Sequence, residues 1–422
     1  MDNTNNTLSP IDMNQHSGKL QIQIVCEAGH RPIDTASVNI YDSRNTDALV
    51  DSLTTDISGI TETIDLETPP LEYSMQPPGP KPYSEYTIEA SAPGLQTIIV
   101  EGVQILPDTS SLQMIFLPRT ADGVENPKRI VIGPHYLYGS YPIKVYEPEV
   151  KDMPDSKDPP VVAIPEYLLV HDGIPDDTTA ADYYIEYRDY IKNVVSSVIY
   201  ANWTNATIYA AILATLSFTL NRYFTNWYQR QGYSFHITSS PAYDQLWLYG
   251  RNIFDNVSLA VDYMFNLFLA RPNILQPILT QSCRGTILDC PNMMSLWGAK
   301  ALGDTGYDTM FILHFYYGND LYISYTNVIT GLVFPWQGVE LRLGSQGGNV
   351  SALQKMLDLI GRVYAAIPSF AVDGDFGPET EKGLSIYQKI FHLPVTGTVD
   401  SATWYSITSL YNSLLDEERH CK

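Results

Sequence analysis

The chain has 422 residues, of which 44% are apolar and 17% charged, so it can bury several hydrophobic cores and is not generically disordered. A formal net charge of −22 argues against binding to nucleic acid or to anionic membranes, which calls for a basic surface. The N-terminal stretch MDNTNNTLSPIDMNQHSG lacks the basic and apolar regions of a Sec signal peptide.

The first third of the chain predicts a tail and then a β domain. Residues 1–17 are polar and are expected to form a disordered tail. Residues 18–119 contain short alternating runs such as KLQIQIV and ASVNIYD, separated by turn residues, which predicts a small antiparallel β-sandwich. The Pro-rich stretch TPPLEYSMQPPGPKPYSEY is expected to form a long ordered loop of this domain.

Residues 120–160 have the composition of a linker. Two segments rich in proline and charge, RTADGVENPKR and EPEVKDMPDSKDPP, flank the stretch IVIGPHYLYGSYP. We expect that stretch to lie extended across a neighbouring domain. An exposed linker between globular parts is also where a protease would cut.

Residues 161–335 predict a mainly helical domain. The stretch ATIYAAILATLSFTLNRYFTNWYQR has apolar residues on nearly every face and predicts a central buried helix. Its apolar centre, residues 208–220, is too short to span a membrane, so no membrane span is expected. SLWGAKALGDTGYDTMFILHFYYG predicts two short helices around a turn at residues 303–306.

Residues 340–415 predict a three-helix bundle. Pro378 suits the first position of the second helix, and Asp400 suits the N-cap of the third. The fold class is therefore multidomain α+β: a β-sandwich, a mainly helical domain and a small bundle.

The four cysteines do not form a disulfide framework for a chain of this length. Cys283 and Cys290 are close enough to pair or to supply half of a metal site, but no cluster of His or Cys completes such a site. No metal and no cofactor is expected.

The C-terminal segment closely resembles the peptidoglycan-binding type 1 domain. The resemblance is carried by LGSQGGNVSALQKML, VDGDFGPETEKGLSIYQ and LPVTGTVDSATWYSI. Its signature includes Asp373, Gly374, Phe376, Gly377 and Trp404. Gly383 stands where the family usually has alanine, at a cost of about 1 kcal/mol in helix propensity. The resemblance implies a cell-wall ligand.

The middle domain and its flanks resemble the SleC-type clostridial spore cortex-lytic enzymes. Matching stretches include IPEYLLVHDGIPDD, DYIKNVVSS, ITSSPAYDQLWLYGRN, RPNILQPILTQSC and WGAKALGDTGY. The resemblance implies a pro-enzyme with an N-terminal prodomain at residues 18–119, a processing region within 120–160 and a SpoIID-like lytic transglycosylase domain at 161–335. It further implies a location in the spore cortex and a germination protease as partner.

The chain departs from that family at its catalytic acid. Such domains carry a Glu eight residues after a Tyr, and this Glu protonates the bridging oxygen of the glycan. Here the register runs from Tyr190 to Val198, with Trp203 following in place. Two further positions that the family places in the cleft have become Tyr209 and Ala211. No catalytic residue is therefore intact.

The site residues expected to remain form a glycan groove. They are Trp203, Tyr243, Asp244, Tyr249, Arg251 and Asn252. We predict a pseudoenzyme that binds cortex peptidoglycan. One alternative is an active transglycosylase that uses a displaced acid, for which the nearest candidates are Asp182, Glu186 and Asp189. Another is a germination protein that acts through protein–protein contacts.

Overall fold

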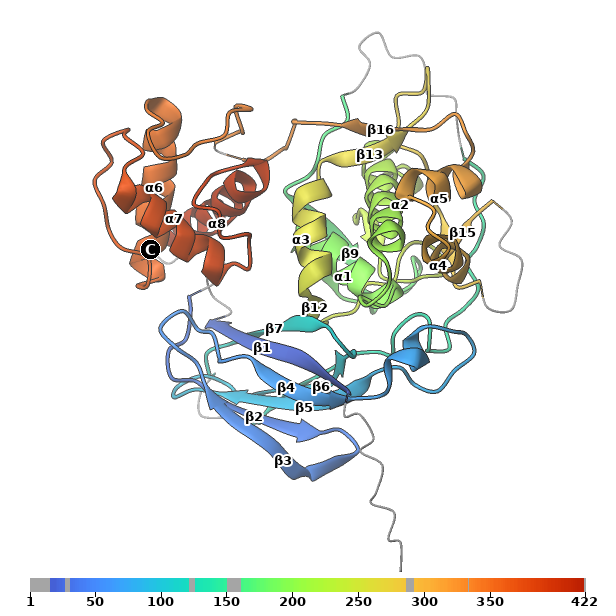
Figure 1. Ribbon diagram of the computed structural model, residues 1–422, viewed down its shortest axis with the longest axis horizontal. Coiled ribbons are helices and arrows are strands. Elements are labelled where there is room, and N and C mark those ends of the chain that lie inside the picture. Colours follow the sequence, from blue (N-terminus) through green and yellow to red (C-terminus); the bar gives the residue numbers. More distant parts are fainter. Residues whose placement is uncertain are drawn as a thin grey trace, which may run out of the picture.

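The computed structural model describes residues 16–26, 31–120, 126–149, 161–285, 292–332 and 334–420 (Figure 1). Within these ranges the chain forms three bodies, each with its own pattern of secondary structure. A β domain comes first, a mainly helical middle domain follows, and a bundle of three helices closes the chain (Figure 1).

The N-terminal domain consists of two sheets packed around a shared apolar core, as a sandwich should. One sheet has the order β12-β7-β1-β4 and the other β3-β2-β5-β6-β8. Alternate residues along β7 are buried, as expected for a strand with one face on a core. The strands are β1 (His16–Cys26), β2 (Ser37–Asp42), β3 (Asn45–Thr54), β4 (Ile64–Thr68), β5 (Ser84–Ser91), β6 (Ile98–Ile105), β7 (Ser110–Leu117) and β8 (Lys128–Val131).

The sandwich differs in two ways from the antiparallel one predicted. Strand β1 pairs with β7 in parallel, and β6 pairs with β8 in parallel. The fully antiparallel prediction is therefore wrong, because these partners are far apart in sequence and leave no local signal. Strand β1 also begins at His16, within the stretch predicted as tail, and β8 comes from the stretch predicted as linker.

The middle domain is built around α2 (Asn205–Phe224), the central helix that the sequence predicted. Its other helices are α1 (Tyr187–Val198), α3 (Asp255–Met264), α4 (Leu296–Asp304) and α5 (Thr309–Tyr317). The two short helices around the predicted turn are confirmed as α4 and α5. Short strands complete the domain: β9 (Tyr167–His171), β10 (Asp182–Glu186), β11 (Ile237–Thr238), β12 (Ile253–Phe254), β13 (Leu267–Ala270), β14 (Ser282–Cys283), β15 (Met294–Ser295) and β16 (Tyr322–Tyr325).

One strand of the middle domain belongs to a sheet of the sandwich. Strand β12 pairs antiparallel with β7, at Ile253 with Leu112 and Phe254 with Ser111. The two domains therefore share backbone hydrogen bonds as well as side-chain contacts, and α3 starts directly at this junction (Figure 1).

The C-terminal bundle contains α6 (Gly348–Val363), α7 (Pro378–Ile390) and α8 (Ser401–His420). Pro378 occupies the first turn of α7, as predicted. Asp400 accepts the backbone N–H of Thr403 at 2.8 Å, which confirms it as the cap of α8. Cys283 is disulfide-bonded, and Cys290, the partner considered for it, lies outside the described residues.

None of the helices that the structure describes combines the length and apolar character needed to cross a membrane. Within the same residues, no group of three or more His, Cys, Asp or Glu side chains is placed to hold a metal ion.

Candidate functional site

Val198, where the family resemblance predicts a catalytic acid, is the last residue of α1. Val198 is 8% exposed, and Ile199 after it turns the chain into an extended conformation. Nine of the twelve residues of α1 are buried, so the helix is held on most of its surface. Its C-terminal end, where Val198 lies, faces the sandwich and the segment that follows it.

That segment, residues 132–149, crosses the end of α1 and is called the strap here. Tyr136 donates its backbone N–H to the carbonyl oxygen of Ser197 at 2.9 Å. The Nε2 of His135 lies 3.0 Å from the carbonyl oxygen of Ile199, and its Nδ1 accepts the N–H of Leu137. Burial holds the pKa of His135 well below its usual value, so the ring is neutral and carries its proton on Nε2. The segment predicted to lie extended across a neighbouring domain therefore crosses the C-terminal end of α1.

The Pro-rich loop of the sandwich covers the turn after α1. Its single helical turn, η1 (Leu71–Ser74), receives two hydrogen bonds from the middle domain. The indole Nε1 of Trp203 donates to the carbonyl oxygen of Ser74, and the amide of Asn202 donates to the Ser74 hydroxyl, both at 2.9 Å. The hydroxyl of Tyr83, further along the same loop, accepts the backbone N–H of His135.

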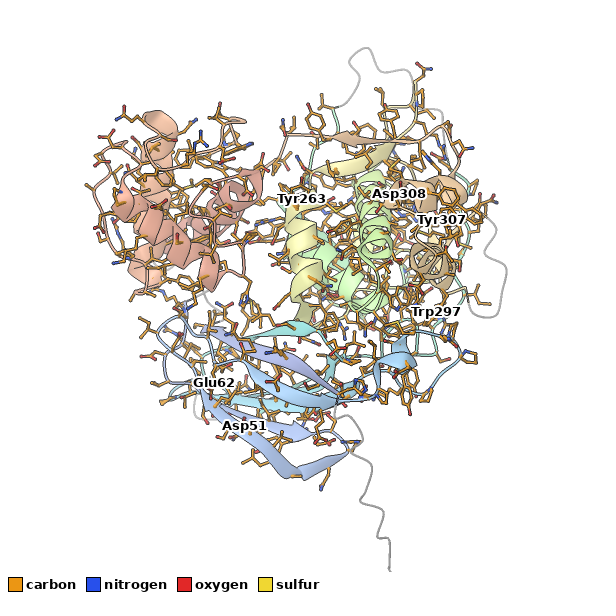
Figure 2. The ribbon with its side chains drawn as sticks, viewed as in Figure 1. Asp51, Glu62, Tyr263, Trp297, Tyr307 and Asp308 are labelled. Atoms are coloured by element: carbon orange, nitrogen blue, oxygen red, sulfur yellow. The ribbon has the colours of Figure 1, made fainter. Side chains whose placement is uncertain are left out.

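An aromatic cluster lies beneath the strap and the Pro-rich loop. The ring of Tyr200 is 4.4 Å from that of His135 and 5.5 Å from that of Trp203. Trp297 stands at the start of α4 (Figure 2). Its ring lies 4.9 Å from that of Trp203. Trp297 was not among the predicted site residues, although it stands in the stretch WGAKALGDTGY that carries the family resemblance.

The three positions predicted to depart from the family pattern lie in different surroundings. Val198 and Ala211 are buried in the middle-domain core, whereas Tyr209 is 37% exposed on the outer side of α2. Residues two apart on a helix point to opposite sides, so Tyr209 and Ala211 do not face the same space.

The candidate replacement acids lie at the other end of α1. Glu186 precedes the first residue of the helix and Asp189 stands in its first turn. A helix of twelve residues is about 18 Å long, so Glu186 is separated by nearly that distance from Val198. Asp182 is further upstream on β10, where it lies 2.8 Å from the imidazole of His171.

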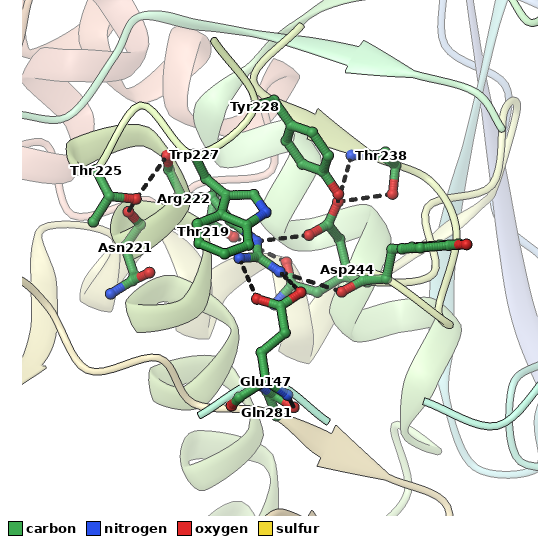
Figure 3. Close-up of polar contacts among 12 residues, drawn as sticks. Glu147, Thr219, Asn221, Arg222, Thr225, Trp227, Tyr228, Thr238, Asp244 and Gln281 are labelled. Atoms are coloured by element: carbon green, nitrogen blue, oxygen red, sulfur yellow. Dashed lines mark hydrogen bonds and ion pairs between the residues drawn. The ribbon is translucent and has the colours of Figure 1, made fainter. Parts of the chain in front are cut away.

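A buried ion-pair network joins the strap to the middle domain (Figure 3). The guanidinium of Arg222 binds Glu147 of the strap through two hydrogen bonds of 2.8 Å and Asp244 through one of 2.7 Å. Asp244 also accepts the Tyr228 hydroxyl and the backbone N–H of Thr238. A buried cation in an apolar helix requires an acidic partner. The presence of Arg222 in the apolar stretch of α2 therefore already indicated a buried ion pair.

Lys144 fixes the strap a second time. Its buried ammonium donates to the carbonyl oxygens of Tyr243 and Asp244. Burial lowers the pKa of this lysine to about 7. Nearby, Arg284 donates to the carbonyl oxygens of Gly139 and Tyr141, so the strap is held along most of its length.

The residues predicted to line a glycan groove are mostly engaged within the protein. Asn252 exchanges two hydrogen bonds with the backbone of Gln104 in β6 and is fully buried. Asp244 belongs to the network above, and Trp203 bonds the sandwich loop. Tyr249 stacks on Tyr183 at 4.9 Å.

Arg251 is the exception among these residues. It is 5% exposed and donates only through Nη2, to the carbonyl oxygen of Ser196 at 2.6 Å. Its Nε and Nη1 have no hydrogen-bond partner within the described residues.

The bundle contains two similar glutamine-centred loops. Gln354 of α6 donates to Asp373 and accepts the backbone N–H of Gly374, both at 2.8 Å. Gln388 of α7 accepts the N–H groups of Thr396 and Gly397 and donates to the carbonyl oxygen of Thr398. Both glycines have positive φ, which their loops require.

The remaining signature residues of the bundle also have structural contacts. Backbone N–H groups, first that of Asp375, lower the pKa of Asp373. Phe376 is buried, Gly377 caps α7, and the indole of Trp404 donates to the carbonyl oxygen of Phe334.

Residues 346–407 match the family model described as "Putative peptidoglycan binding domain". No curated protein sequence matches the chain. Among solved structures, the SleB N-terminal domain is 29% identical over 17% of this chain and 92% of its own, with a TM-score of 0.15.

Two further structures share less sequence. The Bacillus anthracis TIE protein is 12% identical, with 25% of this chain and 17% of its own covered and a TM-score of 0.18. Mercury-inhibited catechol 1,2-dioxygenase from Acinetobacter sp. ADP1 is 15% identical, with 29% and 60% covered and a TM-score of 0.20. With scores this low, the three structures carry no argument about fold or function.

Proposed function

We propose that this protein binds the peptidoglycan of the bacterial spore cortex and that its middle domain is a SpoIID-like lytic transglycosylase domain without its acid. The observation that carries the proposal is the match of residues 346–407 to a peptidoglycan-binding family. The hydrogen bonds that Gln354 and Gln388 make to their loops support a folded binding module.

The loss of activity rests on the position and surroundings of Val198. Valine has no proton to give to a glycosidic oxygen, and transglycosylases need a carboxylic acid there. Glu186 and Asp189 lie near the opposite end of α1 and cannot reach the same point. In this proposal the sandwich and the strap have the role of a prodomain, and a germination protease is the partner that removes them.

Purified cortex sacculi provide the direct test. We expect the intact chain to sediment with sacculi and to release no anhydromuropeptides, before or after limited proteolysis, as measured by mass spectrometry. Release of anhydromuropeptides would reject the pseudoenzyme. Failure to sediment would reject peptidoglycan binding and favour a role in protein–protein contacts.

Restoring the family residues gives a complementary test. The triple variant Val198→Glu, Tyr209→Arg and Ala211→Asn should regain glycan cleavage once proteolysis has removed the sandwich and the strap. Val198→Glu alone buries a carboxyl beneath the strap and should lower the free energy of unfolding by roughly 1–3 kcal/mol. An inactive triple variant that folds and still binds sacculi would show that the domain has lost more than these three side chains.

A further inference from the structure

Buried polar groups without partners collect on one surface of the middle domain. Among the described residues, this surface holds four side chains with an unpaired polar atom: Ser197, Asn202, Arg251 and Trp297. Each such atom costs roughly 1–3 kcal/mol when it is buried without a hydrogen bond. All four lie at or next to the contacts with the strap and the Pro-rich loop.

Arg251 is a buried cation that makes no ion pair among the described residues. Elsewhere in the middle domain Arg188 pairs with Asp262, and Arg222 and Arg271 each pair with two carboxylates. Arg251 instead has one carbonyl oxygen and the ring of Phe254 beside it. A guanidinium in this state can be satisfied by a bidentate carboxylate.

The groups around Arg251 come from the strap and the sandwich as well as from the middle domain. The strap contributes the ring of neutral His135 and the hydroxyl of Tyr141, and the sandwich contributes Tyr83 and Glu85. None of these gives Arg251 a hydrogen bond. An anion that took their place would therefore gain a partner that the closed chain does not supply.

Flat aromatic faces are linked to the cation through His135, whose ring lies 4.4 Å from that of Tyr200 and whose pKa is lowered first by burial and then by the charge of Arg251. Tyr200, Trp203 and Trp297 form one cluster, and aromatic faces of this kind pack against the C–H faces of sugar rings. If the Pro-rich loop moved away, the Trp203 indole and the Asn202 amide would each lose a hydrogen-bond acceptor in Ser74. Sugar hydroxyl and acetamido groups can accept such bonds.

We propose that the surface formed by Ser197, Asn202, Trp203, Arg251 and Trp297 binds a carboxylate-bearing saccharide, and that the strap and the Pro-rich loop occupy it in the closed chain. The inference rests on the proposed function and narrows the ligand of the middle domain. A peptidoglycan strand with its peptide stem supplies both chemical features, the sugar rings and a carboxylate.

The test compares two soluble probes on the full chain. One is a disaccharide tetrapeptide, which carries carboxylates, and the other is the uncharged tetra-N-acetylchitotetraose. In a variant with a loosened strap, His135→Ala with Glu147→Gln, we expect the disaccharide tetrapeptide to bind at least tenfold tighter than in the parent chain, by calorimetry.

Two further substitutions in that background identify the groups involved. Arg251→Met should weaken the tetrapeptide probe about tenfold and leave the uncharged probe unchanged, whereas Trp297→Ala should weaken both. If Arg251→Met left the ratio of the affinities for the tetrapeptide probe and the uncharged probe unchanged, Arg251 would not be the group that binds the carboxylate. A loosened variant that binds no tighter than the parent would overturn the site.

The parent chain offers a measurement that does not depend on the loosened variant folding. Saturating disaccharide tetrapeptide should speed hydrogen exchange at the amides of Tyr136 and Leu137, because the ligand displaces the strap. Unchanged or slower exchange there would count against the proposal. A chain that still sediments with sacculi but fails these tests would leave the proposed function standing and reject only this site.

Discussion

The middle domain meets its two neighbours through interfaces of different kinds. Its contact with the sandwich and the strap, the sandwich seam, contains a shared sheet and the buried Arg222 network. Its contact with the C-terminal bundle, the bundle seam, consists of side-chain contacts such as Asn412 to Glu166 and Tyr405 against Phe265. The sandwich is thus joined to the middle domain by backbone pairing and ion pairs, whereas the bundle is joined to it by side-chain hydrogen bonds and a shared apolar core.

The bundle seam also contains a cavity of about 30 Å³, large enough for a water molecule. Glu166, Glu186 and the rings of Tyr187 and Tyr405 line it, and the two tyrosine hydroxyls have no partner within the described residues. Opening the sandwich seam would break sheet hydrogen bonds and ion pairs, whereas opening the bundle seam would expose mainly apolar side chains.

The largest effect is expected from Arg222→Met. This change leaves Asp244 buried without its cation and releases Glu147, so the free energy of unfolding should fall by roughly 3–5 kcal/mol. Urea unfolding followed by circular dichroism measures it. Glu147→Gln is the matched control, because it loosens the strap and keeps the Arg222–Asp244 pair. Equal losses in the two variants would show that the network is not centred on Arg222.

Two asparagines allow a direct comparison of the seams. Asn252→Ala removes two hydrogen bonds to the backbone of Gln104 and leaves those groups buried, so we expect a loss of roughly 2 kcal/mol. Asn412→Ala removes bonds to Glu166 and to the carbonyl oxygen of Gly331, with an expected loss of about 1 kcal/mol. The reverse order in thermal unfolding would contradict the contrast drawn between the seams.

The bundle seam should respond to pH through Glu186. Burial, with the charge of Asp189 second, raises the pKa of Glu186 from 4.5 to about 7, while Arg188 opposes the shift. Between these two pH values the folded chain holds a proton that the unfolded chain releases, so the contribution of Glu186 to stability is greatest below pH 4.5 and is lost as pH rises to about 7. Glu186→Gln should flatten that slope in unfolding curves measured between pH 5 and 8; an unchanged slope would assign it to another group.

The smallest effect is expected inside the bundle, away from both seams. Gly383→Ala gains up to about 1 kcal/mol in helix propensity, but its new methyl group would lie 2.7 Å from the ring of Phe370. We therefore expect a net change below 1 kcal/mol in thermal unfolding. Gly383→Ala with Phe370→Leu should recover the propensity gain, and a large loss in the single variant would mean that the ring cannot move.

Local patterns in the sequence predicted the elements whose folding depends on neighbours in the chain. The central helix α2, the break between α4 and α5 and the caps of the bundle helices all follow from periodicity and turn residues. The parallel pairing of β1 with β7 and the insertion of β12 join segments far apart in the chain, so no periodic pattern announces them. The hydrogen bonds from the strap to the carbonyl oxygens of Ser197 and Ile199 likewise join distant parts of the chain and could not be predicted from the segment around Val198.

The pairing of β12 with β7 also matters during synthesis, because the two strands leave the ribosome at different times. Strand β7 ends at Leu117, but its partner at Ile253 and Phe254 emerges from the ribosome only after more than a hundred further residues. At ordinary translation rates the edge of β7 waits on the order of ten seconds, with Met114 and Phe116 already on its exposed face. The nascent sandwich is therefore most open to wrong edge pairing in that interval, and a chaperone that shields strand edges would act there.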